Sequence, residues 1–121
     1  MKKIAFLLGV FLFLSSLVSA TSVVSNVDEK EIMTYASGVL ASADPNAQAV
    51  INGDTLTIGR YASDYELGDI EFAAYQAYQL ALAANKIAQH YPGRFQRAIG
   101  IIMDKNRKDT TPLISCGFAY W

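Results

Sequence analysis

The sequence predicts an α+β fold, a two-layer sandwich in which two helices cover one face of a four-stranded antiparallel sheet. The expected order is α-β-β-α-β-β. Three observations lead to this prediction: a long helical pattern over residues 69–91, a hairpin-like segment on each side of it, and a shorter helical pattern before the first hairpin. Because each hairpin supplies two antiparallel strands, both helices are expected on the same side of the sheet.

The central stretch, residues 69–91, contains no proline and no internal glycine. At 100° per residue, its apolar positions fall on one broad face that consists mainly of alanine. This face comprises Ile70, Ala73, Ala74, Ala77, Leu80, Ala81, Ala84, Ile87, Ala88 and Tyr91. Such small side chains predict a helix that lies close to the surface it covers.

The first helix is expected to begin at Asp28, which is spaced with Glu31 as a capping box, and to end at residues 44–46. Residues 47–61 then read as a hairpin around Asn52, Gly53 and Asp54. Two registers are open. A Gly53-Asp54 loop places Ile51 opposite Leu56, whereas an Asn52-Gly53 loop places Ile51 opposite Asp54. The first register is favoured because it keeps the apolar side chains on one face.

Residues 61–68 are interpreted as a link in which Ser63 and Glu66 form a second capping box for a short helical turn. The second hairpin follows the central helix. In its first strand, residues 94–103, the larger apolar side chains alternate with Ala98 and Gly100. Its second strand, residues 112–120, alternates Ile114, Cys116, Phe118 and Tyr120 with small residues. The intervening loop is hydrophilic.

The first twenty residues have the three parts of a secretory signal peptide: Lys2 and Lys3, an apolar run over residues 4–14, and small residues ending at Ala20. We therefore expect residues 1–20 to be a signal peptide and residues 21–121 a single exported domain, periplasmic or secreted. The alternative, an uncleaved membrane anchor, is at the short end of the length needed to cross a bilayer.

Charge argues against a nucleic-acid partner, because the segment 21–121 has a net charge of −3. The charge is unevenly distributed: residues 21–93 carry −6 and residues 94–121 carry +3. No metal site, cofactor site or phosphate loop is expected, since His90 is the only histidine and no glycine-rich pattern occurs. These features favour a protein that is not an enzyme.

One alternative is a small thiol-dependent enzyme that uses Cys116, the only cysteine, with His90 as its base. Nothing in the sequence brings the two residues together. A buried, inert Cys116 is favoured because it lies between Ile114 and Phe118, whereas an exposed Cys116 would predict a disulfide-linked dimer.

Two groups of residues are candidate partner contacts. Phe72, Tyr75 and Leu82 fall outside the alanine face of the central helix, and they form a contact surface if they are exposed together. The alternative is that the first helix or the link covers them.

Around the second hairpin, five cations could meet an anionic surface or an acidic protein: Arg94, Arg97, Lys105, Arg107 and Lys108. Membrane contact is expected only through this hairpin or an uncleaved signal.

Two partial resemblances accompany this interpretation. Residues 28–59 resemble the start of a BON domain, an envelope module, with a helix followed by a hairpin whose second strand reads Asp54-Thr-Leu-Thr-Ile-Gly59. Residues 48–53 resemble the inhibitory hairpin of cystatins, with the glycine displaced by one position. They imply an envelope-binding module and a protease inhibitor, respectively. The preferred expectation is an exported, non-catalytic adaptor that binds a protein or an envelope component.

Overall fold

The structure, a computed structural model, describes residues 28–106 and 112–120. Its elements follow the order α1 (Glu29–Ala43), β2 (Gln48–Asn52), β3 (Thr55–Tyr61), α2 (Asp64–Leu67), α3 (Ile70–His90), β4 (Arg97–Met103) and β5 (Pro112–Ala119). The predicted α+β class is confirmed, with a short third helix, α2, where the capping box of Ser63 and Glu66 had indicated a helical turn. The predicted signal segment lies outside the described residues.

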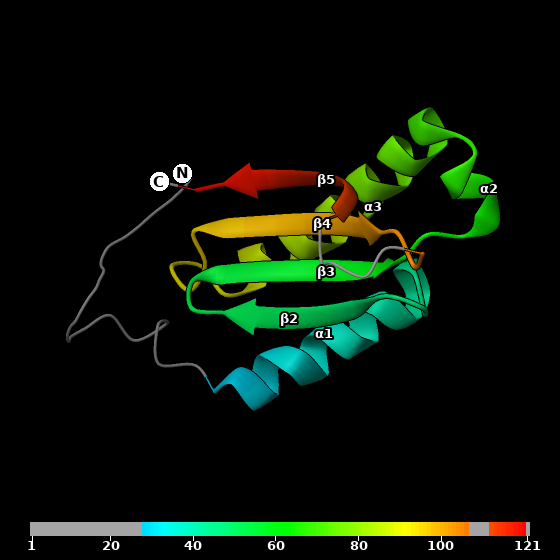
Figure 1. The fold of residues 1–121 in the computed structure, drawn as a ribbon. Coiled ribbons are helices and arrows are strands. Elements are labelled where there is room, and N and C mark those ends of the chain that lie inside the picture. Colours follow the sequence, from blue (N-terminus) through cyan, green and yellow to red (C-terminus); the bar gives the residue numbers. More distant parts are fainter. Residues whose placement is uncertain (1–27, 107–111, 121) are drawn as a thin grey trace.

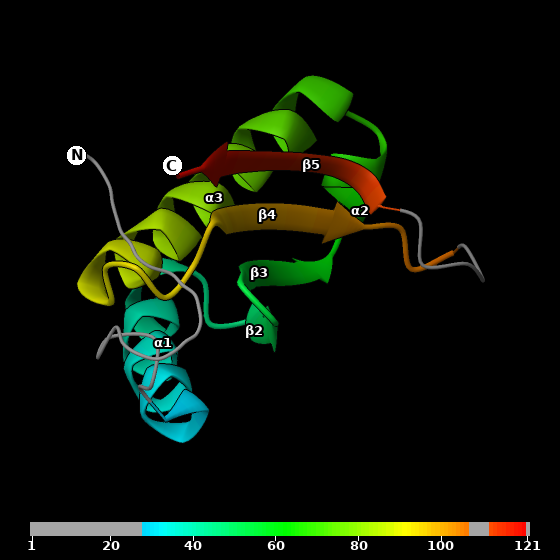
Figure 2. The same ribbon diagram turned by 90° about the vertical axis from the view of Figure 1, so that its left-hand side faces the viewer.

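The strands form one four-stranded sheet in the order β2-β3-β4-β5, with α1 and α3 on the same face (Figures 1 and 2). The prediction of an entirely antiparallel sheet is wrong, because β3 and β4 are parallel. The reason is the long helix between them. The 21 residues of α3 span about 31 Å, which returns the chain to the end of the sheet where β3 begins. The sheet is therefore mixed.

The first hairpin has the favoured register. Ile51 lies opposite Leu56 and Ala49 opposite Ile58, so Gly53 and Asp54 form the loop. Gly53 adopts a φ of 63°, in the left-handed region that glycine tolerates best. Both Leu56 and Ile58 are fully buried beneath the helices. The turn chemistry and the hydrophobic alternation thus select the same pairing.

Helix α1 begins after Asp28 as predicted, but the Asp28 carboxylate accepts a hydrogen bond from the backbone N–H of Lys30 and not of Glu31. Helix α3 is bounded by Asp69 and Tyr91, which agrees with the predicted range. Its alanine face is buried along most of its length, whereas Ile70 is 53% exposed. The N-terminal turns of α3 extend beyond the sheet, which leaves Ile70 without a surface to cover (Figure 1).

α3 and β4 approach each other closely at Gly100. A Cβ atom on Gly100 would clash with the backbone of Ala77 and Ala81, and it would lie 2.8 Å from the carbonyl carbon of Leu80. On either side of Gly100, Ala98 and Ile102 are also fully buried against the helix layer. Because α3 presents alanine and β4 presents glycine at this contact, the backbones of the helix and the strand lie directly against each other.

This contact generates the first prediction. We expect Gly100→Ala to lower the free energy of unfolding by about 3 kcal/mol, because the added methyl group meets rigid backbone. Gly38, in the exposed middle of α1, is the matched control, since a Cβ there meets nothing within 4 Å. Gly38→Ala should stabilise the protein by about 1 kcal/mol. Urea unfolding measures both changes, and equal effects of the two substitutions would contradict the close approach.

Candidate functional site

Three exposed aromatic side chains lie on α2 and the start of α3. They are Tyr65, Phe72 and Tyr75, which we call the aromatic patch. Tyr65 projects from α2 and the other two from the first turns of α3. The rings of Tyr65 and Phe72 meet edge to face with centroids 4.9 Å apart. Tyr75 lies one helical turn after Phe72. The exposed fractions are 65% for Tyr65, 36% for Phe72 and 58% for Tyr75.

The patch agrees with part of the predicted contact surface. Phe72 and Tyr75 are exposed as the surface requires, and α2 contributes Tyr65 to it without covering them. Leu82 differs, because it is half-buried further along α3. Tyr78, which sequence reasoning did not select, is exposed near β5, with its ring 6.4 Å from that of Phe118. Exposed aromatic side chains therefore run from Tyr65 on α2 along α3 to Tyr78, which lies near the β5 edge of the sheet.

A buried ion-pair network fixes α2 to the end of β3. The guanidinium of Arg60, at the end of β3, donates two hydrogen bonds of 2.7 Å to the two carboxylate oxygens of Glu66. Its Nε donates to Asp44, which follows α1, over 2.6 Å. The Glu66 carboxylate also accepts from the backbone N–H of Ser63. Glu66 is only 2% exposed, and through Arg60 the network joins α2 to the end of β3 and to Asp44, the residue that caps α1.

This network accounts for the charge state of Glu66. The hydrogen bonds from Arg60 hold the pKa of Glu66 at about 2, with a further contribution from the backbone of Ser63, and together they outweigh the opposing effect of burial. The same pairing raises the pKa of Arg60. Every polar atom of the network has a partner, so the arrangement is suited to holding α2 in place and not to proton transfer.

The predicted basic surface is divided by the sheet. Arg94 precedes β4 and donates hydrogen bonds to the Gly53 carbonyl oxygen and the Glu29 carboxylate. Lys105 follows the other end of β4 and pairs with Asp64 over 3.0 Å. Arg97 is exposed at the first position of β4. Arg107 and Lys108 lie outside the described residues. The three described cations therefore do not form a single patch.

Cys116 and His90 lie in different parts of the molecule. Cys116 is half-buried in β5 opposite Gly100, which packs against the middle of α3. His90 ends α3, and its ring stacks on that of Tyr35 with centroids 3.9 Å apart. From Ala81 to His90 the helix rises about 13 Å. The geometry does not place this histidine as a base for the thiol.

The open face of the sheet is a second apolar surface, which sequence reasoning did not identify. The side chains of Ile99, Ile101 and Met103 alternate with the buried residues of β4, so they project away from the helices. Exposed neighbours on this face are Val50 and Tyr61. The alternation in residues 97–103 contained a signal for this surface. A helix with an alanine face packs closely on the strand side that holds Ala98 and Gly100, which leaves Ile99, Ile101 and Met103 on the opposite side.

Within residues 28–106 and 112–120, no group of three or more histidine, cysteine or acidic side chains is arranged to hold a metal ion. The helices of this part of the chain are also too short or too polar to cross a bilayer. No known protein family, curated protein or solved structure matches the chain.

The ion-pair network generates a pH-dependent prediction. Glu66 stays ionised in the folded protein down to about pH 2, whereas its ordinary pKa is 4.5. Unfolding therefore takes up a proton between these values, and the free energy of unfolding should fall as the pH is lowered from about 4.5 to 2. Glu66→Gln should cost about 2 kcal/mol at neutral pH, because it leaves the buried Arg60 without its bidentate partner.

Urea unfolding across this pH range is the measurement. Glu71→Gln removes the same charge from an exposed position on α3 and serves as the control. The Glu66 variant should show a flatter acid dependence than both the wild type and the control. Parallel acid profiles in all three proteins would contradict the role assigned to Glu66.

Proposed function

We propose that this chain is an exported, non-catalytic binding module that docks a protein partner on its aromatic patch. The observation that carries the proposal is the joint exposure of Tyr65, Phe72 and Tyr75, with the rings of Tyr65 and Phe72 in contact. Exposed aromatic side chains that lie together mark protein contact sites, since rings bury a large apolar area for little conformational entropy.

The hydrogen-bond network of Arg60 and Glu66 favours an ordered aromatic patch, because it holds α2 in place. Arg60 and Glu66 fix α2 against the end of β3, and α2 sets the position of Tyr65 beside Phe72. A surface that is already ordered before binding loses less entropy when the partner arrives, so more of the contact energy appears as affinity. The buried ion pairs therefore support the proposed binding role indirectly, by preorganising the rings.

The surroundings of the patch indicate the chemistry of its partner. Asp64, Asp69 and Glu71 lie in the first turns of α2 and α3 or cap them, close in sequence to the three rings. Lys105 pairs with Asp64 at one border of this region. The best match is a protein with an apolar depression and basic residues around it, because opposite charges at the rim favour the correct orientation. Anionic lipid would be repelled at this surface.

A crosslinking pull-down of the protein from its native envelope extract tests the proposal. The double substitution Phe72→Ala/Tyr75→Ala should abolish capture of a partner that the wild type retains, since both rings lie in the contact. It should change stability by only a few tenths of a kcal/mol for each exposed residue.

Tyr61→Ala provides the matched control, because it removes an equally exposed tyrosine from the open face of the sheet. This variant should retain the partner. If the double variant captures the partner as well as the wild type does, the binding surface lies elsewhere and the proposal fails. Loss of the partner in the Tyr61 variant alone would instead assign binding to the open face of the sheet.

A further inference from the structure

The outer edge of β5 carries backbone groups that the described residues leave unpaired. β5 pairs with β4 alone, and it ends the strand order of the sheet. The backbone N–H of Tyr120 donates to the Gln96 carbonyl oxygen over 2.9 Å. Because hydrogen-bonded positions alternate in an antiparallel ladder, every second residue before Tyr120 also faces β4. The intervening residues Ser115, Gly117 and Ala119 therefore direct their N–H and C=O groups outward.

This edge lacks the features that usually protect an exposed strand. Proteins block free edges with charged side chains, proline, bulges or short strands. The eight residues of β5 contain no charge, and its one proline, Pro112, stands at the first position. The bulge in the β4–β5 ladder lies at the same end, near Ile102 and Met103. The other edge strand, β2, has only five residues. Among residues 28–106 and 112–120, nothing pairs with the outer edge of the C-terminal two thirds of β5.

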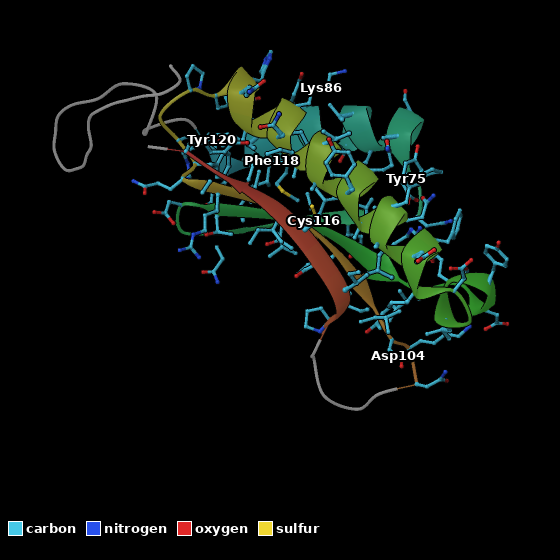
Figure 3. All side chains as sticks on the ribbon, turned by 90° about the horizontal axis from the view of Figure 1, so that it is seen from above. Tyr75, Lys86, Asp104, Cys116, Phe118 and Tyr120 are labelled. Atoms are coloured by element: carbon cyan, nitrogen blue, oxygen red, sulfur yellow. The ribbon has the colours of Figure 1, made fainter. Side chains whose placement is uncertain are left out.

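The edge is also held firmly in position. The Tyr120 hydroxyl donates a hydrogen bond to the side-chain carbonyl oxygen of Asn85 on α3. The side chains of Cys116, Phe118 and Tyr120 project from β5 toward this helix (Figure 3). Their counterparts on the opposite side, Ser115 and Gly117, are small and exposed. An incoming strand would meet a fixed, regular backbone.

We propose that this edge binds the β5 edge of a second copy of the chain, so that two four-stranded sheets join into one of eight strands. Self-pairing suits β5 because an antiparallel pair of these strands brings no like charges opposite each other. A twofold axis through Cys116 gives the greatest overlap of residues 112–120. It pairs Ser115 with Gly117 of the second copy, and both residues direct their backbone groups outward.

The helices leave room for this pairing. α3 crosses β4 at Gly100, which lies directly opposite Cys116 in the sheet. At the level of the proposed axis, the two copies of α3 would therefore be separated by about three strand spacings, roughly 14 Å. Because α3 crosses the strands obliquely and its N-terminal turns extend beyond β5 (Figure 1), the two antiparallel copies of α3 would approach more closely than this along the seam, toward the roughly 8–10 Å of helices in contact. The intervening space borders Tyr78 and Phe118, whose partly exposed rings would be covered.

The oligomeric state of the purified full-length protein tests the proposal, with sedimentation equilibrium as the measurement. The wild type should be a dimer. Ser115→Pro removes one outward N–H from each copy without removing a bond to β4, so dimerisation should weaken roughly thirty-fold through the loss of two hydrogen bonds. Ala49→Pro makes the same change at an outward position of the β2 edge, and this control should remain dimeric.

Cys116 reports the register independently. In the proposed dimer the two Cys116 residues form a pair without backbone hydrogen bonds, with Cα atoms about 4.5 Å apart, which is within disulfide range. Mild oxidation with copper-phenanthroline in air should therefore crosslink the wild type and the Ala49 variant much more readily than the Ser115 variant at the same protein concentration. A monomeric wild type, a Ser115 variant that dimerises normally, or a dimer that does not crosslink would each overturn the proposal.

The proposed dimer and the proposed partner site are separable. Phe72→Ala/Tyr75→Ala changes the aromatic patch and leaves the β5 edge intact, so this variant should still dimerise. Far-ultraviolet circular dichroism and thermal unfolding verify that the Ser115 and Ala49 variants are folded. A folded but monomeric Ser115 variant that still captures the protein partner would support the dimer interface independently of the aromatic patch.

Discussion

The backbone contact between α3 and β4 at Gly100 is the constraint on which the rest of the fold depends. Because the helix lies directly on the strand there, its contact face consists of small residues such as Ala77 and Ala81. The strand in turn places Ala98, Gly100 and Ile102 toward the helices and Ile99, Ile101 and Met103 on the open face. Around this contact, larger buried side chains fill the core, among them Leu56, Ile58 and Ile87.

A second constraint acts at the C-terminal end of β3. The side chain of Arg60 reaches Glu66 in α2, which directly follows β3, and Asp44, which ends α1 sixteen residues earlier, so it joins three elements. Buried ion pairs are weak evidence for added stability, but they specify geometry when each hydrogen bond is satisfied. Here the specified geometry includes the position of Tyr65. The core contact sets the sheet and α3, and the ion pairs set how α2 is attached to them.

Local patterns predicted the parts of the fold that depend on neighbouring residues. The Asn52-Gly53-Asp54 turn and the alternation around it were sufficient for the first hairpin, and alanine spacing was sufficient for α3. The parallel pairing of β3 with β4 was not predictable in this way, because it depends on where α3 returns the chain. The network of Arg60 was missed for a similar reason, since Asp44 is sixteen residues away. Helical spacing predicted that Phe72 and Tyr75 lie outside the buried face of α3, as they do, but only the placement of α2 brings Tyr65 beside Phe72.

The mixed sheet also has a consequence for how the chain folds. Each hairpin joins strands that are close in sequence, so β2–β3 and β4–β5 need only short loops to form. The central seam differs, because pairing Thr55 with Arg97 closes a loop that contains both α2 and α3. Closing so long a loop has an entropic cost, which the contacts between β3 and β4 offset only once α3 has docked on the sheet. The two halves of the sheet would therefore order first, and their union along β3 and β4 would limit the rate of folding.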